Sequence, residues 1–398
     1  MKIAAVICEY NPFHNGHREM LRAVRAEGAE GIAVIMSGSF TQRGDFAVFD
    51  KYIRAQAALQ NGADVVIELP VVYACAGAER FAQGGVYIAD ALGCVSELAF
   101  GSECGNITLL RRACQAVRSE ETLRWTGIFL SQGMTYAAAR RRAAAQAAGE
   151  QTAAVLDEPN NILAVEYLKA LADVDSPIQP LTVKRIGAAH DSGTAAGAIA
   201  SASFIRDCLV SGRDYSGFVP GNTLAAYNDA AGALPAGGRL VRMEQAILCR
   251  LRMMTAGDFS HLPGMSEGLE NRLYAAVREG HSVEEILSIA KCRRYPLSRL
   301  RRSLFHAFLG LTEEDFSAEP QYIKVIGFNE RGRAILRQMK ASAALPVIMK
   351  YRDVRQLSPE GKRMYETESR CDDLFALSGS KNLLCGRNSR ESAFFLSD

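Results

Sequence analysis

The chain has 398 residues, of which 48% are hydrophobic and 23% are charged, enough for two or three domains with a sizeable buried core. This composition excludes collagenous, disordered and coiled-coil proteins. The formal charge of +2 is unevenly divided. Residues 1–215 carry 20 basic against 23 acidic side chains, and residues 216–398 carry 26 against 21, so the second segment is the better candidate to face a polyanion.

Several classes of segment and site are also excluded. Apolar stretches such as residues 65–78 contain a charge, Glu68, and fall short of the roughly 20 residues that a membrane span needs. The N-terminal apolar run 3–8 is too short for the apolar region of a signal peptide. We therefore expect a cytoplasmic protein without a membrane partner. The 10 cysteines include no CxxC pair, so we expect neither a zinc site nor a disulfide framework.

The first two-thirds of the chain alternates short apolar runs with amphipathic stretches of helical period, which predicts βαβ units and a parallel sheet. The predicted strands are 3–8, 31–37, 64–69, 95–100 and 181–186. The predicted helices are 16–26, 49–60, 78–92 and 107–117, with Ala-rich helices at 136–148 and 161–171 inserted before the last strand.

The pattern changes near residue 215. Gly, Pro and Asn in residues 217–222 indicate a linker, after which the apolar period is mostly that of a helix. The predicted helices are 243–254, 266–278, 282–290, 297–309 and 333–340, with strand-like runs at 322–328 and 345–349. We therefore expect an α/β domain over 1–215 and a mainly helical basic domain over 216–398.

An HxGH motif, His14-Asn15-Gly16-His17, follows the first predicted strand and opens the first predicted helix. This is the carboxyl edge of a doubly wound sheet, where nucleotides bind and helix N-terminal N–H groups point at phosphate. Two imidazoles one helical turn apart can donate hydrogen bonds to oxygens of an α-phosphate as charge moves onto its leaving oxygen. Gly16 removes a side chain where a purine or ribose would lie. Isolated histidines at a helix start are usually ordinary surface residues, but this spacing and position favour nucleotide binding, with His14 and His17 catalytic.

A second element, residues 201–206, follows the last predicted strand and begins a helix. Ser201 and Ser203 can cap helix N–H groups or bind phosphate oxygens, and Arg206 can neutralise the leaving pyrophosphate. By itself the segment is equally consistent with a plain Ser cap and a solvated Arg. Together with HxGH it predicts a triphosphate clamp.

These residues resemble the HIGH-type nucleotidyltransferase superfamily, with its Rossmann-like sheet, HxGH and downstream S/T-x-x-[KR] signature. The match is closest to the tRNA(Met) cytidine acetate ligase family. It is carried by VICEYNPFHNGH, MSGSFTQRGDFAVFDKYIRAQAAL, GADVVIELP, LAFGSE, PNNILAVEYLKAL, ASASFIR and VIGFNERGR. Two positions depart from the family pattern: Asp45 stands where Glu is expected, and Phe204 replaces a small residue.

The resemblance implies that ATP and acetate form acetyl-adenylate and pyrophosphate, and that the acetyl group passes to N4 of the wobble cytidine of elongator tRNA(Met). It maps the ATP contacts onto Ile7, Cys8, Glu9, Tyr10, Asn11, Pro12, Phe13, His14, Asn15, Gly16, His17, Arg18, Glu19 and Met20, and onto Gly101, Asn160 and Arg185. Asn160 and Asn161 are difficult to distinguish, and Asn160 is chosen. We expect Mg²⁺ because it normally accompanies ATP phosphates, although the chain has no DxD-type motif.

The residue types suit these implied roles. Gly101 leaves room for a ribose, Asn160 can read a base edge or sugar hydroxyl, and Arg185 offers a planar fork to phosphate. Residues 37–44 should form a long loop over the same edge, where Gln42 and Arg43 either face an acyl carboxylate or the tRNA, or are simply solvated. Lys51 and Arg54 extend this positive wall or are ordinary solvated charges.

Residues 291–302 contain six cations and no acid. Arg294, Arg301 and Arg302 offer phosphate partners and Tyr295 a stacking face, a mixture that favours RNA contact over a solvated helix face. The surface is expected to extend through Lys324, Arg331, Arg333, Arg337 and Lys340, and the triplet 140–142 is a weaker candidate.

Two other functions remain open. One is a cofactor nucleotidyltransferase that adenylylates a small phosphorylated acceptor, such as pantetheine phosphate or nicotinamide mononucleotide. Enzymes of that kind are usually shorter and lack a long basic appendage. The other is a non-catalytic RNA-binding protein with a relic nucleotide pocket, against which the intact His14, Gly16, His17 and Arg206 argue.

Overall fold

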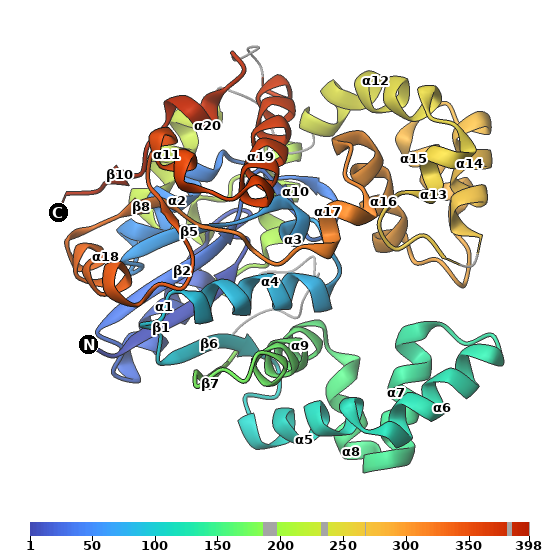
Figure 1. The fold of residues 1–398 in the computed structure, drawn as a ribbon, viewed down its shortest axis with the longest axis horizontal. Coiled ribbons are helices and arrows are strands. Elements are labelled where there is room, and N and C mark those ends of the chain that lie inside the picture. Colours follow the sequence, from blue (N-terminus) through green and yellow to red (C-terminus); the bar gives the residue numbers. More distant parts are fainter. Residues whose placement is uncertain (186–196, 232–237, 267, 380–383, 398) are drawn as a thin grey trace.

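The computed structural model describes residues 1–185, 197–231, 238–266, 268–379 and 384–397. Within them an eight-stranded sheet forms the centre of the molecule (Figure 1). Its strands are β1 (Ile3–Cys8), β2 (Gly31–Ser37), β5 (Val65–Leu69), β6 (Glu97–Ser102), β7 (Gln179–Lys184), β8 (Ile323–Phe328), β9 (Val347–Ile348) and β10 (Phe394–Phe395). The order is β10-β8-β5-β2-β1-β6-β7, and β9 pairs with β8. All pairs are parallel except β5 with β8.

The central strands confirm the predicted parallel sheet. β1 and β2 pair in parallel from Ile3 opposite Gly31 to Cys8 opposite Met36, and the side chains of β2 are buried throughout. Strands covered on both faces have continuous apolar sequences. For this reason the ends of these strands could be predicted from the sequence to within one or two residues. The last predicted strand, 181–186, is β7, and residue 186 lies outside the described residues.

Helices connect and cover these strands (Figure 1). In the first part of the chain they are α1 (Asn15–Ala26), α2 (Lys51–Gln60), α3 (Val71–Ala74), α4 (Ala78–Ala91), α5 (Ile107–Arg118), α6 (Glu120–Ser131), α7 (Tyr136–Ala148), α8 (Glu150–Ala153), η1 (Ala154–Asp157), α9 (Pro159–Asp173) and α10 (Ala202–Ser211). Helices α5 to α8 form a lobe below the sheet in this view.

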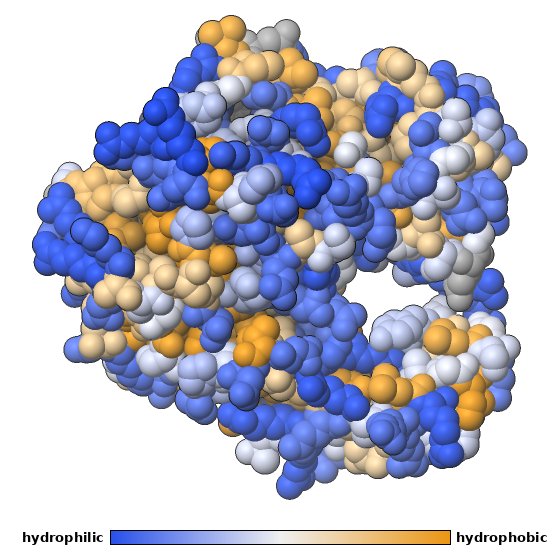
Figure 2. Space-filling model, viewed as in Figure 1, coloured by the Kyte–Doolittle hydropathy of each residue, from blue (hydrophilic) through white to orange (hydrophobic). Residues whose placement is uncertain are grey.

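The remaining helices are η2 (Ser216–Phe218), α11 (Gly221–Ala231), α12 (Gly238–Met253), α13 (Ala256–Ser260), α14 (Leu269–Glu279), α15 (Val283–Ala290), α16 (Leu297–Leu309), α17 (Glu313–Ser317), α18 (Glu330–Ser342), η3 (Tyr351–Gln356), α19 (Pro359–Leu377) and α20 (Arg387–Arg390). Helices α12 to α16 form a second lobe at the upper right. Figure 2 shows the molecule hollowed between the two lobes.

The second segment differs from the expected separate domain. Its late strands β8, β9 and β10 belong to the central sheet, because β8 pairs with β5 over residues 65–68. Residues 216–398 therefore leave the sheet for the helical lobe and then return to it. The apolar run at 322–328 predicted the strand, but one sequence gives no signal for its antiparallel partner.

The strand order places a binding site. From β1 the chain moves to β2 and β5 on one side and then to β6 and β7 on the other. Such a reversal leaves a crevice outside the carboxyl ends of the strands that flank it. HxGH follows β1 and Gly101 lies in β6, so both lie at this crevice. Among the described residues, no helix is long and apolar enough to cross a membrane.

Candidate active site

A cavity of about 560 Å³ lies at the carboxyl end of β1 and β6. Its lining comes from β1 and the following turn, α1, β6, the starts of α9 and α10, and the short antiparallel hairpin of β3 (Phe40–Thr41) and β4 (Asp45–Phe46). The predicted site residues that line it are Ile7, Cys8, Glu9, Tyr10, Asn11, His14, Gly16, His17, Glu19, Met20, Gly101, Asn160, Arg185, Ser201, Ser203 and Arg206. The sequence therefore predicted residues that the fold brings together from five separate segments.

Four predicted contacts, Pro12, Phe13, Asn15 and Arg18, are outside this lining. The N–H of Phe13 donates to the Tyr227 hydroxyl at 2.8 Å. The Asn15 amide donates to the carbonyls of Ala198 and Gly217. Phe13 and Asn15 therefore hold the turn against neighbouring segments. The sequence motif alone does not show which of its residues have this role and which contact a ligand.

The two histidines form one unit. His14 caps α1, and its ring stacks on that of His17 with centroids 3.7 Å apart. Nδ1 of His14 accepts the N–H of Gly16 at 3.0 Å, and Nδ1 of His17 accepts the N–H of His14 at 3.3 Å. A neutral imidazole whose Nδ1 accepts a hydrogen bond carries its proton on Nε2. The capping box therefore assigns both rings the tautomer with Nε2–H as donor.

Electrostatics keeps both rings neutral. Burial, together with Arg185 and Arg206, lowers the pKa of His14 to about 3. Burial, then His14 and Arg185, lowers the pKa of His17 well below its usual value. Desolvation and nearby cations both disfavour imidazolium. At neutral pH the pair therefore offers two neutral N–H donors to an anionic ligand.

Gly16 has a second reason to be glycine besides room for a ligand. A Cβ atom at this position would stand 2.9 Å from Cε1 of His14. A side chain would push the ring away from its cap, so the glycine of HxGH also protects the orientation of the first histidine.

The start of α9 is fixed by a carboxylate that sequence reasoning missed. Glu103 accepts the Asn160 amide at 2.6 Å and the backbone N–H of Asn161 at 2.8 Å. Asn161 is buried, and its side-chain oxygen accepts the N–H of Cys104. Asn160 lines the cavity, so the geometry favours Asn160 over Asn161 as a ligand contact.

Arg185 directly follows β7, and its side chain lies beside Gly101 of the neighbouring strand β6. A Cβ at Gly101 would stand 3.2 Å from Cγ of Arg185, and Nη1 of Arg185 is 3.4 Å from the side-chain oxygen of Asn160. Gly101 therefore leaves room for the Arg185 side chain to pass close to β6 on its way to Asn160.

Ser201 and Ser203 have different partners. The Ser201 hydroxyl caps α10 by accepting the N–H of Phe204 at 3.1 Å. The Ser203 hydroxyl accepts a hydrogen bond from Nη2 of Arg206 at 2.9 Å. Nη1 of Arg206 donates to the carbonyl of Asn11 at 2.8 Å. Arg206 therefore connects the start of α10 with the turn that leads into HxGH.

Residues 37–44, expected to be a long loop, instead enter the β3–β4 hairpin. Its backbone is fixed by Glu9, whose carboxylate accepts the N–H of Gln42 at 2.6 Å. Thr41, Gln42, Arg43 and Asp45 line the cavity, as does Arg301 of α16. Asp45 was noted in the sequence only as a departure from the family pattern.

For Lys51 and Arg54 the sequence left open an extension of the positive wall or ordinary solvated charges, and both alternatives were wrong because the two side chains are buried. Arg54 donates to the carbonyls of Glu9, Ser37, Gly38 and Phe49. Lys51 donates to Glu68 and Asp372. Helical spacing alone does not show which face of α2 is covered.

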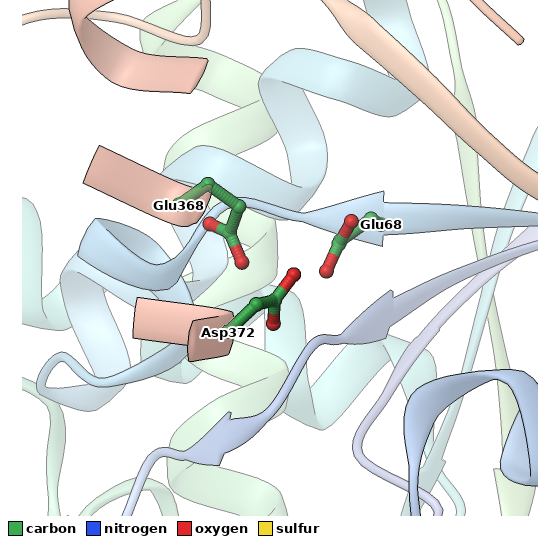
Figure 3. Close-up of side chains that lie close together, drawn as sticks. All are labelled: Glu68, Glu368 and Asp372. Carbon is green, nitrogen blue, oxygen red and sulfur yellow. The ribbon is translucent and has the colours of Figure 1, made fainter. Parts of the chain in front are cut away.

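Glu68, Glu368 and Asp372 come together in the core, with ligating atoms within 4.8 Å of one another (Figure 3). Two ammonium groups lie among them: Lys51, and Lys324, which contacts Glu68 at 2.6 Å. Burial and the neighbouring carboxylates raise the pKa of Glu368 well above its usual value. A protonated Glu368 leaves two anions facing two cations, so the cluster is electrically balanced by its own lysines.

The structure changes several RNA-contact predictions. Tyr295 and Lys324 are buried, so neither offers the predicted surface. Arg331, Arg333, Arg337 and Lys340 are exposed but lie on α18, at the opposite end of the molecule from α16 (Figure 1).

The arginine triplet has partners of its own. Arg140 pairs with buried Glu166 at 2.7 Å, Arg141 pairs with Asp157 and Glu150, and Arg142 lies over the ring of Phe129. In the segment 291–302, Lys291, Arg293 and Arg294 are exposed.

The chain is similar to several known proteins. The family model described as HIGH Nucleotidyl Transferase matches residues 1–388. A protein of Thermoanaerobacter sp. (strain X514) named tRNA(Met) cytidine acetate ligase is 35% identical over 97% of this chain and 98% of its own. A protein of that name from Syntrophotalea carbinolica is 37% identical over 93% of this chain and 89% of its own.

Two solved structures cover both chains completely. The apo crystal structure of Thermotoga maritima TmcAL has a TM-score of 0.94 and 30% identity. The crystal structure of the same protein bound with alpha-thio ATP has a TM-score of 0.91 and 29% identity. The similarity therefore covers the central sheet and both helical lobes.

Proposed function

Because the chain belongs to the HIGH nucleotidyltransferase family and, within it, to the tRNA(Met) cytidine acetate ligases, we propose that it activates acetate with ATP and acetylates N4 of the wobble cytidine in elongator tRNA(Met). The observation that carries the proposal is the stacked, neutral pair of His14 and His17 in the cavity. The relative bound with alpha-thio ATP supports ATP as the nucleotide.

In the first step, an acetate oxygen attacks the α-phosphorus and pyrophosphate leaves. The Nε2–H groups of His14 and His17 donate to α-phosphate oxygens, where negative charge increases in the transition state. Arg206 and Ser203 lie next to the pair and bind the departing pyrophosphate. Asn160 and Arg185 hold the nucleotide at the β6 edge.

Mg²⁺ would arrive on the ATP phosphates. Within the described residues, the group of three carboxylates with spacing suited to an ion, Glu68, Glu368 and Asp372, lies outside the cavity lining and is already paired with lysines. Mg²⁺ is commonly bound through substrate phosphates with few protein ligands. It would neutralise charge on the leaving pyrophosphate.

In the second step, the cytidine amine attacks the acyl carbon of the adenylate and AMP leaves. The mixed anhydride is already activated, so positioning and exclusion of water contribute most of the acceleration. The base must leave its stack to reach the cavity. Lys291, Arg293 and Arg294, exposed where α15 leads into α16, and Arg301, at the cavity itself, suit contact with tRNA phosphates.

The direct test is incubation with ATP, radiolabelled acetate and an unmodified elongator tRNA(Met) transcript. We expect one acetylcytidine per tRNA and release of AMP and pyrophosphate, with no product on a transcript carrying uridine at position 34. Adenylylation of pantetheine phosphate or nicotinamide mononucleotide without tRNA would instead support the cofactor nucleotidyltransferase function. Absence of ATP binding would support the non-catalytic one.

A further inference from the structure

We propose that the β3–β4 hairpin holds the acceptor cytosine: the Asp45 carboxylate accepts a hydrogen bond from the N4 amine, and the Gln42 carboxamide donates one to N3. The assignment of this subsite rests on the proposed function. It adds the side chains that recognise the base.

The hairpin lies on one side of the histidine pair within the same cavity. Arg206 acts electrostatically on both His14 and Asp45. Arg185 acts on the two histidines, and Arg301 acts on Asp45. All of these side chains line the one cavity, and Arg206 lies near both His14 and Asp45. An adenylate with its phosphate on the histidines and its ribose toward Arg185 directs its acyl group to the hairpin.

The hairpin offers a donor and an acceptor that the protein leaves available. Among the described residues, Nε2 of Gln42 is buried and has no hydrogen-bond acceptor. The Asp45 carboxylate accepts one described N–H, that of Phe46 at 2.8 Å. A buried donor without a partner is unfavourable, which favours a ligand that supplies an acceptor there.

Cytosine matches this pair. Its Watson–Crick edge presents the N4 amine as donor and the adjacent N3 as acceptor. Uracil reverses both groups, so it would place an acceptor against Asp45 and a donor against Gln42. Burial raises the pKa of Asp45, and a more basic carboxylate is a better proton acceptor from an amine.

The other carboxylates of the lining have structural partners. Glu9 holds the N–H of Gln42 at 2.6 Å, and Glu19 contacts Arg22 at 2.9 Å. Glu9 and Asp45 each accept one backbone N–H, but Asp45 lies on the same hairpin as Gln42, so it is the lining carboxylate best placed to pair with Gln42 around one base.

The hairpin also lies between the nucleotide and the proposed tRNA surface. Nη1 of Arg302 donates to the carbonyl of Gln42 at 3.3 Å, and the neighbouring Arg301 lines the cavity. A nucleotide whose phosphate contacts Arg301 would bring its base between α16 and the adenylate.

The transfer step moves the acetyl group from AMP to the base. The N4 lone pair forms the C–N bond to the acyl carbon, and the C–O bond to the adenylate breaks with its electrons leaving on AMP. One N4 proton passes to the Asp45 carboxylate, which returns it to solvent. The products are N4-acetylcytidine and AMP.

The first test separates transfer from adenylation. Acetyl transfer to tRNA and acetate-dependent ATP–pyrophosphate exchange are measured for Asp45→Asn and Asp45→Glu. We expect Asp45→Asn to lower the ratio of transfer to exchange about 100-fold, and Asp45→Glu to restore most of it. Glu366→Gln, at an exposed position of α19, is the matched control.

A proportional loss of both reactions in Asp45→Asn, or no loss of transfer, would overturn the assignment of Asp45. If the unmodified protein shows no acetate-dependent exchange, the proposed function fails instead, so the two failures are distinguishable.

The second test addresses Gln42 by a double-substitution cycle with tRNA that carries 3-deazacytidine at position 34. Replacing N3 by C–H should slow transfer about 10-fold in the unmodified protein and less than about 2-fold in Gln42→Ala. Fully additive effects would show that Gln42 does not contact N3.

Discussion

The backbone of Arg302 lies directly against Gly44: a Cβ atom at Gly44 would stand 2.7 Å from the Arg302 nitrogen and 2.8 Å from its Cα. Gly44 also has φ +69°, a conformation that side chains disfavour. This contact seats the β3–β4 hairpin on α16 and so joins the cavity to the helical lobe.

Substituting Gly44→Ala should therefore displace the hairpin from α16. We expect destabilisation by about 2 kcal/mol or more, from the strained φ and the backbone clash together, and a marked loss of acetyl transfer. The measurement is urea unfolding beside the tRNA assay. Gly310→Ala is the control, because Gly310 has φ +68° but nothing within 4 Å of its added Cβ. Equal destabilisation of the two variants would contradict the account.

Glu103→Gln should weaken ATP binding. The Glu103 carboxylate fixes the start of α9 through the Asn160 amide and the Asn161 N–H, and a neutral amide holds these donors less strongly. We expect the KM for ATP to rise about 10-fold with a smaller change in kcat. An unchanged KM would show that the position of Asn160 does not depend on Glu103.

The free energy of unfolding should fall on acidification because the buried histidines resist protonation in the folded protein. The pKa of His14 is about 3 in the folded protein and about 6.5 in an unfolded chain. Between these values the unfolded state binds a proton that the folded state does not, so unfolding becomes easier as pH falls.

Measured by urea unfolding at pH 7, 6 and 5, this dependence should be weaker in His14→Gln by up to about 1.4 kcal/mol per pH unit. His281→Gln is the control because its side chain is 86% exposed. A slope in His14→Gln equal to that of the unmodified protein would contradict a buried neutral ring.

Alanine at Lys291 and Arg293 should weaken tRNA binding without altering discrimination at position 34. Both side chains are exposed near the start of α16, and each phosphate contact removed should lower the salt slope of log K by about 1. Filter binding across a salt series measures this. Arg331→Ala and Arg337→Ala on the distant α18 serve as controls, and an equal effect of the two pairs would relocate the tRNA surface.

Most of the central sheet could be predicted from the sequence because β1, β2 and β5 are buried on both faces and read as unbroken apolar runs. The two histidines could be predicted as site residues because the HxGH motif is continuous in the sequence. The tautomer of the pair could not be predicted, since it depends on hydrogen bonds that exist only once α1 is capped.

What the sequence could not show depends on contacts between distant segments. The burial of Lys51 and Lys324 could not be predicted, because their carboxylate partners, Glu68 and Asp372, come from other parts of the chain. Glu103 acts through a helix that begins more than fifty residues later. In each case a charged side chain looks solvated until its partner is known.

Acetate-dependent ATP–pyrophosphate exchange in His14→Ala and His17→Ala isolates the step at which the paired rings act. With folding verified by circular dichroism, we expect a loss of at least about 100-fold for each variant, the usual effect of removing one preorganised donor. Exchange at the rate of the unmodified protein in either variant would contradict it.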